Sequence, residues 1–146
     1  MRNEIDRIIE VVAAWDDVNQ QPHRFGGIEF NLGKIEIGHV HLGGGLVDIP
    51  FTRRIREALV KTGAAEHHHL LPETGWISFW LGRTGSADDA IRLYRLSYLH
   101  KRARRDRTID LSGELTALWW DEGVIAAATN GPGSETQVGD TEDAHN

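Results

Sequence analysis

The sequence contains no cysteine. Without thiols, a disulfide framework, a thiolate metal site and a cysteine nucleophile are all excluded. No apolar run approaches the roughly 20 residues that span a bilayer, and the first residues lack the apolar core of a secretory signal. The absence of cysteine also fits a reducing compartment. We therefore expect a cytoplasmic protein with no membrane partner.

The chain also lacks an excess of positive charge. The formal charge is −6, and four acidic residues near the end of the chain account for −4 of it, which leaves −2 for the rest. A near-neutral body gives no global electrostatic reason to expect nucleic-acid binding. A length of 146 residues suits one domain. We expect that domain over residues 1–123, followed by a Gly, Ser, Thr and acidic tail over 124–146 without fixed structure.

What the sequence does contain is a clear alternation of two hydrophobic periods. Apolar residues at three- and four-residue steps predict helices over residues 3–18, 53–62 and 114–121. Thr52 is the expected N-cap of the second helix. A further helix is expected after a capping box at Ser86–Asp89, and it runs into the cations at 101–105. Strict alternation predicts strands over residues 27–32, 35–42, 46–49 and 76–81. This order predicts an α+β fold. It consists of a small antiparallel sheet of about four strands, packed with N-terminal, middle and C-terminal helices.

The most informative stretch is Gly38-His39-Val40-His41, at the end of the second predicted strand. Apolar residues fall on odd positions before Gly38 and on even positions after it. Without a bulge, His39 and His41 continue the inward face and point at the core or at a pocket in it. With a bulge at Gly38, Val40 returns to the core and the histidines face outward. The sequence leaves both arrangements open.

Two imidazoles at i and i+2 on a strand can converge on one ion, and a third could come from the His67-His68-His69 run. One interpretation is a divalent metal site at His39, His41 and His68. A second makes one histidine of the pair a general base oriented by Asp48. A third is that the histidines bond only to strand ends, loops and water, and that Asp48 pairs with an arginine. His-x-His is a pattern of low specificity.

Two other features could form an interaction surface. Trp76, Trp80, Trp119 and Trp120 could stack on a ligand or join two copies of the chain, although the simplest expectation is that the last helix covers the Trp76 strand. A basic segment over residues 101–107 could contact phosphates. Alternatively, these cations only lie in solvent at the C-terminal end of a helix and bind no partner. These cations are Lys101, Arg102, Arg104, Arg105 and Arg107.

Several motifs, taken in order, resemble those of the family known as the luciferase domain. They are Phe25-Gly26-Gly27-Ile28-Glu29-Phe30, Gly38-His39-Val40-His41, Asp48-Ile49-Pro50-Phe51, His68 with Leu71-Pro72, Gly75-Trp76 and Leu96-Ser97-Tyr98. The resemblance spans roughly residues 24–100. It implies a small domain without an assigned reaction. The Gly-Trp strand and the acid-capped helix after it are also similar to the YjbR-like family, whose α+β fold is linked to DNA binding.

We therefore expect a domain that binds a small ligand or acts as an enzyme at a histidine-lined site. In this interpretation His39, His41 and Asp48 carry the chemistry. His68 and Trp76 contact the ligand, and the three histidines could hold a metal. The alternative is a nucleic-acid or protein interaction module of the YjbR-like type that uses the basic segment 101–107.

Overall fold

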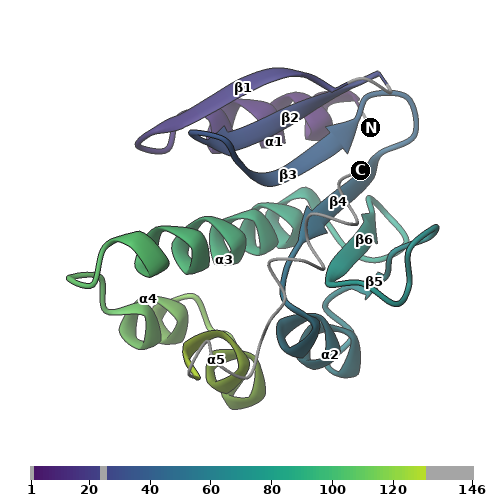
Figure 1. Cartoon of the computed structure of the whole chain (residues 1–146). Coiled ribbons are helices and arrows are strands. Elements are labelled where there is room, and N and C mark those ends of the chain that lie inside the picture. The colour runs from purple at the N-terminus through teal and green to yellow at the C-terminus, as the bar shows by residue number, and fades with distance from the viewer. Residues whose placement is uncertain (1, 24–25, 131–146) are drawn as a thin grey trace.

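The computed structural model describes residues 2–23 and 26–130 of the chain (Figure 1). They form an antiparallel sheet and helices, so the predicted α+β class is confirmed. The sheet has six strands in the order β1-β2-β3-β4-β6-β5, two more than expected. The strands are β1 Val18–His23, β2 Gly27–Leu32, β3 Ile35–His41, β4 Leu46–Pro50, β5 Glu66–His67 and β6 Trp76–Trp80. The helices are α1 Arg2–Ala13, α2 Arg53–Lys61, α3 Ala87–Arg105, α4 Leu111–Ala117 and α5 Glu122–Thr129.

Strand β1 was not expected, because the sequence predicts a helix that continues to residue 18. In the structure this helix ends at Ala13. The chain turns through Asp17, whose φ is 66°, and enters an edge strand that pairs only with β2. Pro22 lies in this strand, where an unpaired outer edge tolerates a residue without an N–H. Apart from Val18 at its start, its other side chains are polar, so no hydrophobic alternation marks it. Strand β5, only two residues long, was missed for the same reason.

One face of the sheet is apolar and carries the core. Val40 lies opposite Ile28 on one side and Val47 on the other, and Val47 lies opposite Phe79. These side chains pack against α1 and α3, and α3 also contacts α4 (Figure 1). Because strand side chains alternate, the residues between them point to the opposite face. We call it the helix-free face, since none of the helices in residues 2–23 and 26–130 covers it in Figure 1. That face carries most of the polar side chains discussed below.

A β-bulge in β3 decides how the histidines point. Phe30 of β2 pairs with Gly38 and the next residue pairs with Glu36, so Ile37 has no partner of its own. Gly38 has a φ of 153°, and a Cβ there would lie 2.8 Å from Tyr94 Cε1. The bulge at Gly38 is therefore the correct alternative. Val40 returns to the core, and His39 points to the helix-free face.

The end of the chain differs from the prediction. The single helix expected over residues 114–121 is two helices, α4 and α5, with a break at Leu118–Trp120. The domain boundary expected after residue 123 falls inside α5, where Val124 and Ala128 are buried. Residues 131–146 of the expected tail lie outside the described part. Within the described ranges, no helix combines the length and apolar character that a membrane span requires.

Candidate His/Asp site

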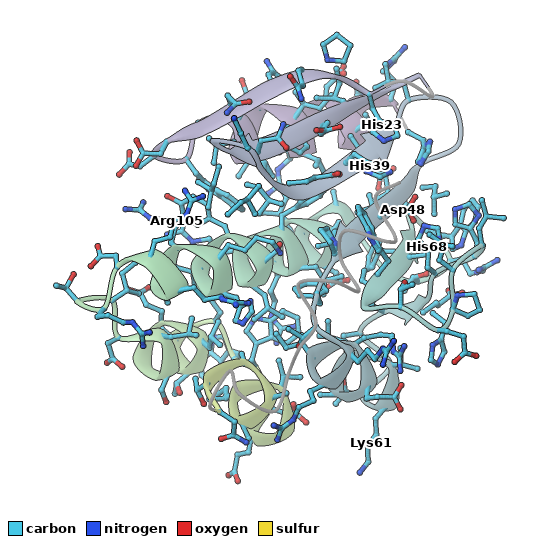
Figure 2. The ribbon with its side chains drawn as sticks, in the orientation of Figure 1. His23, His39, Asp48, Lys61, His68 and Arg105 are labelled. Carbon is cyan, nitrogen blue, oxygen red and sulfur yellow. The ribbon has the colours of Figure 1, made fainter. Side chains whose placement is uncertain are left out.

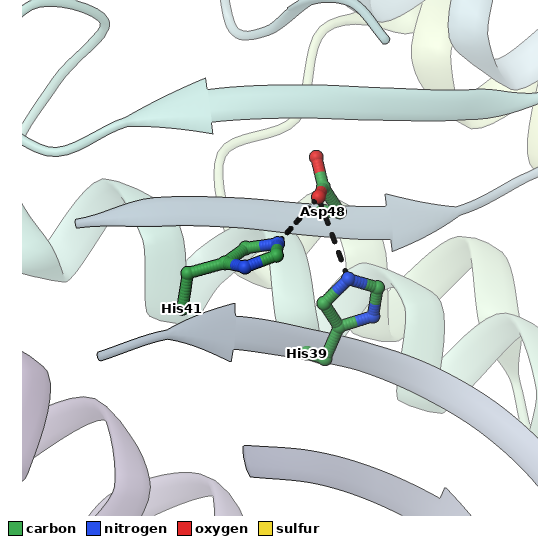
Figure 3. A group of neighbouring side chains, drawn as sticks. All are labelled: His39, His41 and Asp48. Atoms are coloured by element: carbon green, nitrogen blue, oxygen red, sulfur yellow. Dashed lines mark hydrogen bonds and ion pairs between the residues drawn. The ribbon is translucent and has the colours of Figure 1, made fainter. Parts of the chain in front are cut away.

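Asp48 is the centre of a histidine cluster on the helix-free face. It sits in the middle of β4, with His39 of β3 opposite it on one side and Ser78 of β6 on the other. Its carboxylate is 2% exposed, and four imidazole Nε2 atoms lie 3.0–3.7 Å from its oxygens. They belong to His39, His41, His68 and His69. Figure 2 shows His39 and His68 near Asp48, and Figure 3 shows the contacts of His39 and His41 with Asp48. A buried carboxylate is thus surrounded by rings that can donate protons or bind metal.

His39 lies between two carboxylates. Its Nδ1 is 2.6 Å from Glu36 Oε2, and its Nε2 is 3.4 Å from Asp48 Oδ2. Burial alone would lower the pKa of His39. The hydrogen bonds to Asp48 and Glu36 outweigh burial and raise that pKa to about 9. The two acids therefore create a position that attracts positive charge.

The two oxygens of Asp48 have different partners. Oδ2 is 3.0 Å from His41 Nε2, whereas Oδ1 accepts a 2.8 Å hydrogen bond from the Ser78 hydroxyl. Burial would raise the pKa of this carboxyl, but the hydrogen bonds from His39 and His41 lower it below its usual value. Asp48 therefore stays ionised, with Oδ2 directed at the histidine pair.

His68 is held in one protonation state by its own loop. Its Nδ1 accepts hydrogen bonds from the backbone N–H groups of Leu70 and Leu71, at 3.1 and 3.0 Å. A nitrogen that accepts two such bonds carries no proton, so the neutral ring is protonated on Nε2. Burial lowers the pKa of His68 to about 4. The neutral ring thus directs an N–H at Asp48 Oδ1, 3.6 Å away.

Two further histidines complete the cluster, and neither was singled out from the sequence. His69 Nε2 is 3.7 Å from Asp48 Oδ2, and its side chain is 33% exposed. His23, from the unexpected strand β1, stacks on His39 with ring centroids 3.9 Å apart. His41 and His69 are the more exposed members, with 25% and 33% of their side chains accessible. A molecule from solvent would therefore reach Asp48 on their side.

The structure brings together all the residues predicted for this site. The side chains of His39, His41, His68 and Asp48 converge as described. The ring centroid of Trp76 lies 5.5 Å from that of His39 and 6.0 Å from that of His68. The expectation that the last helix covers the Trp76 strand is wrong. Trp76 and Trp80 share the face of Asp48, and the histidines pack against them.

Glu29 and Glu36 are the two acids of the hairpin that the sequence offers as a further carboxylate for the histidines, and Glu36 is the one that bonds to His39. Strict alternation puts residues 36 and 39 on opposite faces of a strand. The bulge returns them to the same face. In the sequence, the bulge is indicated only by the apolar residues, which change from odd to even positions at Gly38.

The basic segment over residues 101–107 lies away from the histidine cluster, and only some of its cations are exposed to solvent. Lys101 Nζ donates to Pro50 O at 2.7 Å and to Ser97 Oγ at 2.9 Å, and burial lowers its pKa to about 7. Arg102 donates to the Tyr98 hydroxyl. Arg104 and Arg105 are exposed, and Figure 2 shows Arg105 far from the histidine cluster. Phosphate contact by this segment stays a prediction.

Two sets of side chains have donor atoms close enough to hold an ion. One is His39, His41 and Asp48, and the other is Asp48, His68 and His69. In each set the donor atoms lie within 4.8 Å of one another. Asp48 belongs to both sets.

Comparison with known families supports the resemblance seen in the sequence. Residues 34–97 match the family model of the luciferase domain. The matched segment contains every member of the cluster except His23. No curated protein and no solved structure matches the chain significantly. The YjbR-like similarity stays a prediction.

Proposed function

We propose that this domain binds one divalent transition-metal ion through His39 Nε2, His41 Nε2 and Asp48 Oδ2. The ion would act as a Lewis acid toward a small ligand or substrate. The observation that carries this proposal is the convergence of the two imidazoles on one oxygen of a buried carboxylate, at 3.4 and 3.0 Å. Donors bonded to a common ion at about 2.0–2.1 Å lie roughly 3.0–3.4 Å apart in octahedral or tetrahedral geometry.

The surroundings of His39 support a metal ligand. Metal-binding histidines usually donate their second ring N–H to a carboxylate, which fixes the ring and leaves the other nitrogen for the ion. Glu36 is placed for this role, since its Oε2 is 2.6 Å from His39 Nδ1. His39 Nε2 then points toward Asp48. Glu36 and Asp48 are both buried, and a cation between them would offset their charge.

The other residues of the cluster have supporting roles. Ser78 occupies Oδ1 of Asp48, which leaves Oδ2 for a single bond to the ion. His68 carries its proton on Nε2, so the nitrogen that faces Asp48 is not free to bind an ion, and we leave His68 out of the ligand set. This changes the set predicted from sequence, in which His68 was the third ligand and Asp48 an orienting acid.

Three protein ligands leave coordination positions open, as in catalytic metal sites. An ion there could polarise a carbonyl or phosphoryl oxygen, or lower the pKa of a bound water. His69 is partly exposed and 3.7 Å from Asp48 Oδ2, so it is placed to exchange a proton with such a ligand. Two histidines and one carboxylate are donors that suit iron, zinc, cobalt or manganese. The function proposed is therefore a metal-dependent small-molecule site.

The test is the metal content of the untagged full-length protein. The protein is exposed in turn to zinc, iron(II), cobalt and manganese, desalted, and measured by native mass spectrometry and elemental analysis. We expect one ion per chain with at least one of these metals. The variants His39→Ala and Asp48→Asn should lose that ion while keeping the fold.

The matched control is His67→Ala. His67 belongs to the same triple-histidine run but is exposed and outside the cluster. Its removal should leave the ion in place. Protein that stays free of all four metals would contradict the proposal. So would an ion that survives in His39→Ala but is lost in His67→Ala.

A further inference from the structure

Trp119 is held in a backbone conformation that suits glycine. It follows α4 as the second residue past the helix end, with a φ of 66°. Its N–H donates to Thr116 O at 3.0 Å, and the N–H of Trp120 donates to Leu115 O at 3.2 Å. This pair of bonds is the Schellman ending of a helix, in which glycine usually takes the left-handed position. A side chain with a Cβ is strained there.

Packing does not explain a tryptophan at this position either. The Trp119 side chain is 87% exposed, whereas Trp120 beside it is 6% exposed and belongs to the core. Arg92 fixes the segment by donating to Leu118 O at 2.8 Å and to Trp119 O at 2.7 Å. A large aromatic side chain is thus held rigidly in solvent at some conformational cost. Strained residues of this kind are concentrated at binding sites.

A cavity of about 320 Å³ lies next to this indole. Its size is at the lower end of the range for small-molecule sites. Its lining includes Asp89, Arg92, Trp120 and Asp121 together with Trp119. None of these residues belongs to the His/Asp cluster, so this site is separate from the proposed metal site.

The polar groups of the cavity are incompletely bonded. Asp89 Oδ2 accepts from Ser86, and Asp121 Oδ1 accepts from Val124 N. The second oxygen of each carboxylate accepts no hydrogen bond from residues 2–23 or 26–130. In the same ranges, the indole N–H of Trp120 is buried without an acceptor. The cavity therefore offers two acceptors, whereas the fully buried indole N–H of Trp120 is not open to a ligand.

These groups define the chemistry of a ligand. Two aspartates and one arginine give the cavity a net negative charge, which disfavours anions. Hydroxyl groups can donate to the carboxylate oxygens. A flat ring with an apolar face can stack on the exposed indole of Trp119. We propose that the cavity beside Trp119 binds a sugar, whose ring stacks on Trp119 and whose hydroxyls donate to Asp89 and Asp121.

Fluorine NMR of the full-length protein labelled with 5-fluorotryptophan tests this proposal. The chain has five tryptophans, so five resonances are expected. Methyl glucoside, methyl galactoside, methyl mannoside and N-acetylglucosamine are titrated in turn. At least one sugar should shift the Trp119 and Trp120 resonances saturably and leave the Trp15 resonance unchanged.

The decisive variant is Trp119→Asn, because asparagine tolerates the left-handed conformation and lacks the indole. Its melting temperature should be no lower than that of the wild type, while the sugar should bind at least ten-fold more weakly. Trp119→Phe should keep most of the binding.

Three results would overturn the proposal. The first is the absence of any sugar-dependent shift in Trp119 and Trp120. The second is a shift produced by tetramethylammonium in place of the sugars, which would indicate a cation site. The third is a Trp119 resonance that moves with protein concentration alone, which would indicate an interface between copies of the chain.

Discussion

Glu36 and His39 are three positions apart on one strand, yet Glu36 Oε2 lies 2.6 Å from His39 Nδ1. In a regular strand these two side chains would point to opposite faces. The bulge at Ile37–Gly38 places both on the helix-free face, beside Asp48. The proposed metal site thus depends on one irregularity in β3.

Replacing Glu36 with Gln should weaken metal binding by about 10- to 100-fold, the usual effect of losing an orienting partner of a histidine ligand. The fold should be retained, because the amide has nearly the same shape. Affinity is measured by competition with a chromophoric chelator. Glu29→Gln is the matched control, since Glu29 lies opposite His39 in the register but bonds to Gln21. Equal affinities in the two variants would contradict the role of Glu36.

Replacing Gly38 with Ala should destabilise the protein by about 1–3 kcal/mol, the usual cost of overpacking. The added Cβ would lie 2.8 Å from Tyr94 Cε1 and 3.0 Å from Ile49 Cγ1. Gly43→Ala is the control, because a Cβ there meets nothing within 4 Å. Urea denaturation of both variants measures the difference. Equal stability would show that β3 tolerates a side chain at the bulge.

Replacing His68 with Ala should lower stability by about 1–3 kcal/mol, because two backbone N–H groups lose their acceptor. The metal stoichiometry should stay at one ion per chain, since His68 carries its proton on the nitrogen that faces Asp48. Denaturation and native mass spectrometry on the same sample separate these effects. A folded His68→Ala protein without its ion would place His68 among the ligands.

The stability of the metal-free protein should decrease as the pH is lowered, partly because of His100. Burial, with smaller contributions from Lys101 and Arg104, lowers the pKa of His100 from 6.5 to about 3. Between these values the unfolded chain binds more protons than the folded one, so the free energy of unfolding rises with pH. His100→Leu should flatten this part of the profile, measured by urea denaturation in EDTA. A slope equal to that of the wild type would contradict the assignment.

The parts of the fold that were predicted correctly have strong local signals. The capping box of Ser86 and Asp89 and the N-cap at Thr52 both occur as expected. Strand β1 was missed because an edge strand with one paired side does not need apolar alternation. The break between α4 and α5 was missed because tryptophan at position 119 gives no sign of a left-handed turn.

The central residues of the cluster were predictable from the sequence, but its arrangement and its other members were not. The types and spacing of His39, His41 and His68 indicated a cluster near Asp48. The protonation of His68 depends on backbone N–H groups of Leu70 and Leu71 that no spacing rule reveals. His69 and His23 join the cluster through loop and strand geometry that the sequence pattern does not encode.

The most direct test of the metal assignment is a two-bond ¹H–¹⁵N spectrum of the histidine rings, recorded before and after one equivalent of zinc. We predict that the Nε2 signals of His39 and His41 move to metal-bound positions while His39 keeps its Nδ1 proton. His68 should remain protonated on Nε2 throughout. Unchanged His39 and His41 rings, or zinc bound first by His67 or His68, would contradict the account.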